Sequence, residues 1–445
     1  MQTSIYKQFW KYTIPTVAAM LVNGLYQVVD GIFIGRYVGA DGLAGINVAW
    51  PMIGSILGLG MLVGVGTGAL VSIQQGKQDN QGAKQILATG LLLLIALVPV
   101  VSALLFLFAD DFLRWQGAEG RVFELGLQYL HILIGASVFT LGSIAMPFLL
   151  RNDESPNIAT FLMVVGAVVN IVLDYLLIAL WGWELTGAAL ATAIAQGVVT
   201  LLGFAYFFSS HAKLRLHWKD LRLKLATIPN IFAIGASSFF MYAYGSMMVA
   251  LHNALFSQYG DQLMIGAYAI LGYIVTVYYL TAEGIANGMQ PLVSYNHGAR
   301  NQQNIRKLLK VAMYSSVLVG VVFVVLLNLF PTQFVSVFNK EDAQLVEYTV
   351  LGIRLHMFAL ALDGFLVVAG AYYQAINKGS KAMFVTVGNM LIQLPFLYIM
   401  PKLFGVPGIW IAYPLSNIAL SVVVMTMLWK DVKRFQVTSG EQATA

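Results

Sequence analysis

The sequence of 445 residues is 59% hydrophobic and only 10% charged, which excludes an ordinary soluble protein and indicates a polytopic membrane protein. Its 25 lysines and arginines outnumber its 20 acids, for a net charge of +5. The absence of cysteine excludes disulfides, cysteine-bound zinc, iron–sulfur clusters and thiol nucleophiles. We expect no cleavable signal, because Lys7 and Lys11 lead directly into a full-length apolar segment.

Apolar segments long enough to cross a bilayer recur along the whole chain. A crossing helix needs roughly 20 apolar residues at a rise of ~1.5 Å each. Twelve segments meet this need, and an even number places both termini on one side of the membrane. The segments lie at about 13–35, 43–70, 84–109, 125–150, 156–180, 185–208, 226–257, 263–291, 308–330, 348–375, 382–401 and 407–429.

The basic residues predict which side that is. Nineteen of them fall in the tails and in one set of loops, five fall in the opposite set, and Arg354 lies inside the tenth segment. Because cytoplasmic loops carry the excess of lysine and arginine, we expect cytoplasmic termini in a bacterial inner membrane. The positive net charge is then an orientation signal, and we expect no nucleic-acid partner.

The chain repeats itself internally. Residues Val71–Leu87 and Val293–Leu309 share Val, Ser, Gly and Leu in register at an offset of 222 residues. This repeat divides the chain into a first lobe (1–208), a basic cytoplasmic linker (209–225) and a second lobe (226–445). We therefore predict an all-α polytopic membrane protein with twelve transmembrane helices in two pseudo-symmetric six-helix bundles, an architecture that suits alternating access.

Four acids fall inside the apolar segments and are the candidates for chemistry: Asp30, Asp174, Glu283 and Asp363. A carboxylate at membrane depth costs ~2.5–3.5 kcal/mol on insertion scales, so such a residue usually has a function. At the repeat offset Asp30 corresponds to His252, so the second half lacks an acid there. For Glu283 and His252, structural and functional roles both remain open.

Counting residues along the helices brings two of these acids to a similar depth. Asp30 lies ~28 Å and Asp174 ~30 Å along outward-running segments. Asn170 is one turn below Asp174 on the same face, and Thr192 lies in the outer half of the next segment. We predict that the four converge on one site, where one carboxyl must hold a proton or lie beside a cation. The alternative is a purely structural hydrogen-bond network.

Aromatic residues and methionines suit recognition of flat or cationic ligands, although packing alone also explains them. We assign five residues to a candidate substrate cavity: Tyr26, Gln27, Met163, Tyr175 and Tyr273. The sequence contains no GxxxxGK[ST], HExxH or GxSxG motif, which disfavours an ATP-driven pump or a hydrolase of those types. Of the energy sources considered, coupling to an ion gradient is the one that remains.

Several stretches together resemble a known family. VDGIFIGRYVGADGLAGIN lies in the first span and its loop, NIVLDYLLI in the fifth, GAALAT in the sixth and PLVSYNHGARN after the eighth. In this order and spacing they resemble the multidrug and toxic compound extrusion (MATE) family, most closely its DinF and MepA-like bacterial members. The resemblance implies a monomeric inner-membrane antiporter without a prosthetic cofactor. It would expel cationic or amphipathic compounds in exchange for H⁺ or Na⁺.

The same resemblance implies an ion site in the first lobe at Asp30, Asn170, Asp174 and Thr192. Asp363 matches the acid that the NorM branch of the family uses in its tenth span. The acid of that branch's seventh span is missing, with His252 and Asn253 in the region. The resemblance therefore favours coupling through the first lobe, with H⁺ mildly preferred over Na⁺.

Two other functions are considered. A lipid-linked oligosaccharide flippase of the related superfamily would have similar bundles, but more cationic residues lining its cavity than these spans offer. A polytopic membrane enzyme would need a catalytic cluster at one membrane face, and the sequence contains none.

Overall fold

The computed structural model describes residues 4–443, apart from the side chains at 40, 246, 262 and 434–443, and every regular element in this range is helical. The first half contains α1 (Ile5–Tyr37), α2 (Ala40–Gly76), α3 (Asn80–Trp115), α4 (Gly120–Gly135), α5 (Ser137–Asn152), α6 (Pro156–Asp174), the π-helical turn η1 (Tyr175–Leu180) and α7 (Glu184–Phe208). Two short 3₁₀ turns, η2 (Trp218–Asp220) and η3 (Leu225–Thr227), follow in the linker.

The second half repeats this pattern. It contains α8 (Ile228–Tyr259), α9 (Gln262–Gly298), α10 (Gln302–Leu329), α11 (Pro331–Ser336), α12 (Ala343–His356), α13 (Leu360–Ala375), α14 (Gly379–Phe404) and α15 (Val406–Ala443). Within the described range, ten helices are long and apolar enough to cross a membrane. Two further crossings are bent pairs, α4 with α5 at 64° and α12 with α13 at 54°. Counting each bent pair as one span confirms the predicted twelve.

The helix ends differ from the apolar segments. The second segment was predicted to end at 70, but α2 continues to Gly76, and α9 continues from the predicted 291 to Gly298. Hydropathy marks the part of a helix inside the hydrocarbon, whereas helical hydrogen bonding continues through its polar end. The two bends were not predicted either, because the hydrophobic pattern runs through them without interruption.

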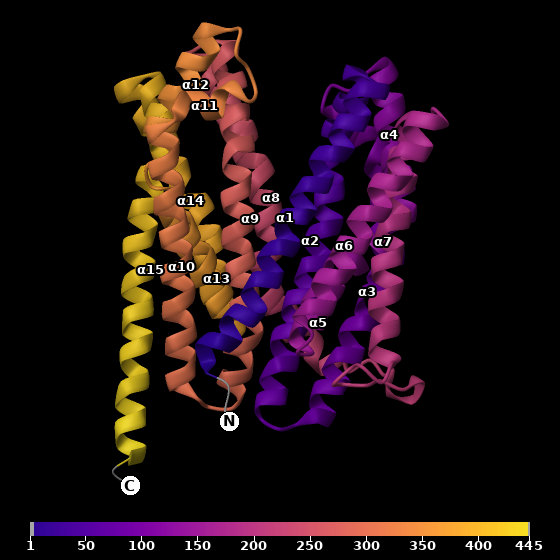
Figure 1. Ribbon diagram of the computed structural model, residues 1–445, viewed down its shortest axis with the longest axis vertical. Helices are drawn as coiled ribbons and strands as arrows, with labels where there is room; N and C mark the ends of the chain where they lie inside the picture. The colour runs from indigo at the N-terminus through magenta and orange to yellow at the C-terminus, as the bar shows by residue number, and fades with distance from the viewer. Residues whose placement is uncertain (1–3, 444–445) are drawn as a thin grey trace.

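The helices form two bundles, α1–α7 and α8–α15, here called the first and second bundle (Figure 1). Among the described residues, the first bundle has one main buried apolar core, and the second has two. Both chain termini and the linker lie at the same end of the molecule (Figure 1), which we call the terminal end. The bundles meet at this end, and the other is called the opposite end.

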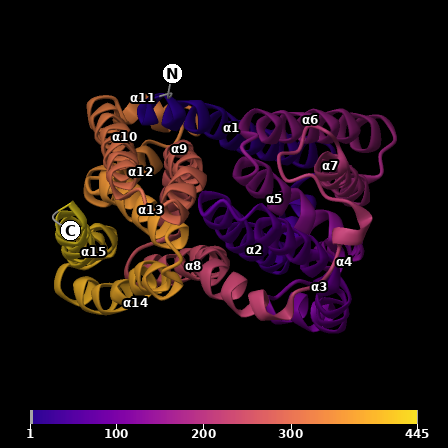
Figure 2. The same ribbon diagram turned by 90° about the horizontal axis from the view of Figure 1, so that it is seen from below.

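The first helix of each bundle also packs on the other bundle. Phe9 and Tyr12 of α1 are buried in a core of the second bundle. Ile231 and Ile234 of α8 are buried in the core of the first. Figure 2 shows α1 and α8 passing between the bundles on opposite sides. The two bundles are therefore joined by a pair of exchanged helix ends, which a division of the sequence at the linker does not reveal.

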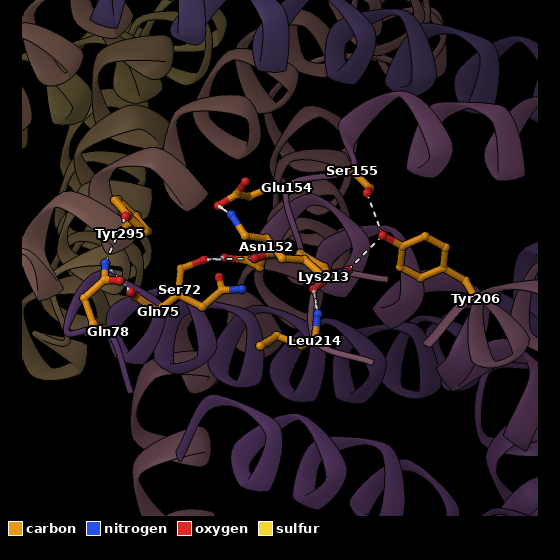
Figure 3. Close-up of polar contacts among 11 residues, drawn as sticks. Ser72, Gln75, Gln78, Asn152, Glu154, Ser155, Tyr206, Lys213, Leu214 and Tyr295 are labelled. Carbon is orange, nitrogen blue, oxygen red and sulfur yellow. Dashed lines mark hydrogen bonds and ion pairs between the residues drawn. The ribbon is translucent and has the colours of Figure 1, made fainter. Parts of the chain in front are cut away.

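The linker is anchored to the first bundle by Asp153, directly after α5. Its carboxylate accepts hydrogen bonds from the backbone N–H groups of Lys213 at 2.9 Å and Leu214 at 2.8 Å, and from the Tyr206 hydroxyl at 2.8 Å (Figure 3). Burial raises the pKa of Asp153, and these three hydrogen bonds oppose that rise because they favour the ionised form. The first residues of the linker are thus held on the bundle surface.

Candidate functional site

Two carboxyl groups meet inside the first bundle. Asp30 lies on α1 and is partly buried, while Asp174 is the last residue of α6 and is fully buried. The two side chains lie close enough for each to influence the protonation of the other, although no hydrogen bond joins them. Counting residues along the helices predicted a similar depth, and the structure places the two acids near each other.

The acid pair has very few donors around it. Among the described residues, no N–H or O–H group hydrogen-bonds to either oxygen of Asp174 or to Oδ1 of Asp30. Two ionised carboxylates can only accept hydrogen bonds, so their close approach favours a proton on one of them or a cation between them. A pair in this environment is chemically able to take up and release a positive charge.

Asn170 and Thr192 lie beside the pair. The Asn170 Nδ2 donates to the Thr192 hydroxyl at 3.3 Å, from α6 to α7, and the Asn170 Oδ1 has no donor among the described residues. All four residues that the sequence brought together thus belong to one region. A fifth, Tyr129 of α4, is buried with its hydroxyl within hydrogen-bonding reach of Thr192. Sequence reasoning missed Tyr129, because one tyrosine in the apolar stretch GLQYLHI carries no distinguishing signal.

The type of helix changes next to the acid pair. Immediately after Asp174 the α-helix gives way to the π-helical turn Tyr175–Leu180. Such wider turns are uncommon and occur frequently at functional sites. The π-helical turn therefore places Asp174 at the end of the α-helical part of this span.

The candidate substrate residues divide into two groups. Tyr26 lies one turn before Asp30 on α1, in electrostatic range of both acids, and its hydroxyl interacts with Gln27. Met163 is partly buried on α6, and Tyr175 is 50% exposed beside Asp174. Tyr273 belongs elsewhere: it is 65% exposed on α9 of the second bundle, and its ring stacks on Phe338 at 5.9 Å. The structure therefore does not bring Tyr273 to the acid pair.

Asp363 of α13 has a different environment. Its carboxylate accepts hydrogen bonds from the Tyr279 hydroxyl at 2.6 Å and from the Asn417 amide. The Tyr279 hydroxyl also lies 3.1 Å from the Tyr413 hydroxyl. The sequence showed no partner acid for Asp363, and in the structure its partners are neutral donors. Asp363 therefore differs from the acid pair in having hydrogen-bond donors on its carboxylate.

His252, at the position equivalent to Asp30, lies in an aromatic cluster. It is 1% exposed, its Nδ1 lies 2.8 Å from the Met248 carbonyl oxygen, and its ring stacks on Tyr268 at 4.9 Å. The ring of His356 is 5.7 Å away. The two bundles share their shape, but at this position they differ in chemistry.

Glu283 of α9 is partly buried between the bundles. It makes no hydrogen bond or ion pair with a described residue. The hydroxyl of Tyr242, on α8, lies in electrostatic range of both Glu283 and Tyr26. Tyr242 is therefore within electrostatic range of Glu283 and of Tyr26, which in turn is within range of the acid pair.

Comparison with known proteins decides the family. The MatE family model matches the chain twice, at residues 15–176 and 237–399, and the two matches begin 222 residues apart. The chain belongs to the MatE family. The double match covers most of the sequence and has the same offset as the internal repeat, and it makes the protein a transporter and not an enzyme.

Relatives within the MatE family cover almost the whole chain. The multidrug export protein MepA of Staphylococcus aureus (strain NCTC 8325 / PS 47) is 26% identical over 435 residues, which are 97% of this chain and 95% of MepA. MepA of Staphylococcus saprophyticus subsp. saprophyticus is 24% identical over 432 residues, 97% of this chain and 95% of that protein.

Solved structures share the fold. One is described as the outward-facing conformation of a multidrug resistance MATE family transporter of the MOP superfamily; it has a TM-score of 0.92 at 23% identity and covers 97% of each chain. A MOP superfamily transporter from Pyrococcus furiosus has a TM-score of 0.92 at 23% identity, covering 98% of this chain and 97% of the other.

Proposed function

We propose that this MatE protein is an ion-coupled antiporter that exports cationic and amphipathic compounds by alternating access, acting as a monomer. The observation that carries the proposal is the close approach of Asp30 and Asp174, a partly and a fully buried acid with almost no hydrogen-bond donors. Such a pair binds a positive charge in one state and releases it in another. The relatives that match most of the chain are multidrug export proteins, which supports cargo of this kind.

The coupling ion we propose is H⁺. Na⁺ would need several oxygen ligands, and Asp30, Asn170, Asp174 and Thr192 are the residues that would supply them. However, the Thr192 hydroxyl already accepts from the Asn170 amide and lies within reach of Tyr129. That leaves chiefly the two carboxyls and the Asn170 Oδ1, and a pair of acids with few neutral oxygen partners holds a proton readily.

Proton binding would act through α1. Protonation removes a charge from the pair and changes how α1 packs on α6, to which it is tied by the Thr160 hydroxyl donating to the Pro15 carbonyl oxygen at 2.8 Å. Pro15 and the glycines of α1 offer places where the helix can bend. A bend towards the first bundle would displace a bound cation, so that proton and cargo compete.

The experiment uses the purified protein in sodium-free proteoliposomes with an imposed pH gradient, a pH-sensitive dye and a fluorescent organic cation. We expect cargo movement in one direction with proton movement in the other. A strict requirement for sodium would reverse the choice of ion. Absence of any ion-driven cargo movement, with either gradient, would contradict antiport itself.

We also propose a bacterial inner-membrane location with cytoplasmic termini, because nineteen basic residues lie in the tails and loops of that side against five on the other. A cysteine replacing Lys219 in the linker, in this cysteine-free chain, should resist an impermeant thiol reagent in intact cells and react after permeabilisation. A cysteine replacing Arg121, in the first turn of α4 at the opposite end, is the matched control and should react in intact cells. The opposite labelling pattern would contradict this topology and place the linker and the termini outside the cell.

A further inference from the structure

The bundles touch at the terminal end through a set of contacts that repeats with the 222-residue offset. Where α2 crosses α9, a Cβ added to Gly76 would meet the carbonyl oxygen of Tyr295, and one added to Gly298 would meet the carbonyl oxygen of Ile73. Gly76 is equivalent to Gly298, and Ile73 to Tyr295. The crossing is therefore two-fold symmetric, and its two helix backbones are in contact because neither glycine has a side chain.

The exchanged ends of α1 and α8 use glycine in the same way. A Cβ on Gly66 of α2 would meet the backbone of Ile231 on α8, and a Cβ on the equivalent Gly288 of α9 would meet the backbone of Thr13 on α1. Three crossings of helix on helix thus join the bundles at this end, and each depends on glycines that permit close approach.

Polar side chains run through the same region. The Ser72 hydroxyl donates to Oδ1 of Asn152 at 2.6 Å (Figure 3), and the Asn152 amide donates across to the second bundle, to Oε1 of Gln290, at 3.2 Å. The Gln290 amide donates to Ser294 at 3.0 Å, and Ser294 donates to the Ala375 carbonyl oxygen at 3.0 Å. These hydrogen bonds form one buried chain from α2 through α5 and α9 to α13.

This chain also follows the repeat. Ser72 is equivalent to Ser294, and Asn152 to Gln374. The Gln374 amide lies within hydrogen-bonding distance of the Ile234 carbonyl oxygen at 3.2 Å and of the hydroxyls of Ser237 and Ser238 at 2.7 and 2.8 Å. Those three residues belong to the part of α8 that packs on α2. Equivalent amide side chains thus lie on both sides of the junction: Asn152 bonds across it, and Gln374 fixes the part of α8 that packs on the first bundle.

Between the described side chains, hydrogen bonds from one bundle to the other occur at the terminal end and not towards the opposite end. Among the described side chains of α1–α7 and α8–α15, the hydrogen bonds that join the bundles are Asn152 to Gln290 and Gln78 to Tyr295 at 3.4 Å. Both lie at the terminal end, where the bundles converge in Figure 1. Hydrogen bonds between described side chains therefore join the bundles at the terminal end.

We propose that these contacts form a gate, which consists of the Gly76–Gly298 crossing and the chain Ser72–Asn152–Gln290–Ser294. The inference rests on the proposed alternating access, because cargo can enter from the terminal side only if the bundles part there. Backbone contacts made by glycine are numerous but individually weak. Each neutral hydrogen bond is worth only ~0.5–1.5 kcal/mol net, since water replaces it on opening. Such an interface is stable when closed and still separable.

The test measures distances between spin labels in this cysteine-free chain. One pair replaces Gln81 and Gln303, exposed equivalent positions at the terminal end; the other replaces Tyr37 and Tyr259 at the opposite end. The structure has the gate closed. Compared with the wild type, the double variant Gly76→Val, Gly298→Val should show longer distances for the terminal pair of labels and shorter distances for the opposite pair. We expect a change of ~10-fold or more in the ratio of the two populations.

The matched control is Gly54→Val with Gly272→Val, on the same two helices, where an added Cβ meets nothing within 4 Å. It should leave both distributions unchanged. Asn152→Ala removes the bundle-crossing bond without adding bulk, and it should shift the populations in the same direction if the valine variant fails to fold. Unchanged distances in Asn152→Ala and in every folded glycine variant would overturn the gate. Shifted distances in a protein that shows no ion-driven cargo movement would instead uphold the gate and contradict the proposed function.

Discussion

Replacing Asp30 by asparagine should abolish proton-driven efflux while leaving the protein folded and able to bind its cargo. The close approach of Asp30 and Asp174 favours a shared positive charge, because the described residues supply almost no hydrogen-bond donors to these carboxyls. An asparagine amide donates a permanent hydrogen bond to Asp174 and so replaces the proton with a group that cannot leave. The first bundle would then remain in one state, and Asp174→Asn should have the same effect for the same reason.

Asp363→Asn is the matched control, since it makes the same chemical change to a buried acid in the other bundle. Asp363 already receives hydrogen bonds from Tyr279 and Asn417, and it has no partner acid with which to share a proton. This variant should keep substantial efflux, with an altered range of cargo. Initial rates in sodium-free proteoliposomes compare the variants, and cargo binding in detergent checks that each is folded. Efflux at the wild-type rate by Asp30→Asn would contradict the mechanism, and loss of coupling in Asp363→Asn alone would place it in the second bundle.

The sequence predicted the positions of Asp30 and Asp174 because helices convert residue number into depth at a fixed rise. Two acids at similar depth in neighbouring spans are expected to face each other in the bundle interior. The free-energy cost of a carboxyl group at membrane depth is lowest there. The repeat was predictable for a related reason. Its offset of 222 residues is set by the chain length of one bundle, and both matches of the family model and the gate glycines follow it.

What the sequence did not predict depends on side-chain direction. Tyr129 and Tyr279 are two tyrosines among 21, and only the packed helices show that one reaches Thr192 and the other Asp363. Tyr273 was assigned to the substrate cavity on residue type alone, and its position on α9 turns it towards Phe338 instead. The exchanged ends of α1 and α8 were missed because a helix that changes bundle has the same apolar pattern as one that does not.

Glu283→Gln should weaken the binding of a monovalent organic cation by ~10-fold or more, which corresponds to ~1.4 kcal/mol. Glu283 is a partly buried carboxylate without an ion pair or hydrogen bond to any described residue, and Tyr242 lies in electrostatic range of it. An unpaired carboxylate beside tyrosine rings complements a cationic aromatic molecule, through charge and through attraction of the cation to the rings. We therefore propose that Glu283 contacts cargo, and that Tyr242 and Tyr26 lie between it and the acid pair.

The measurement is the Kd of a fluorescent organic cation for the protein in detergent, at a pH where the wild type binds. Glu283→Asp keeps the charge and should recover most of the affinity, and Glu283→Gln should bind a neutral amphipathic cargo as the wild type does. Together these results separate a contact with the positive charge from a change in packing. An equal loss of affinity for cationic and neutral cargo would instead make Glu283 a structural residue of the α9 surface, and an unchanged Kd for the cation would remove it from the cargo site.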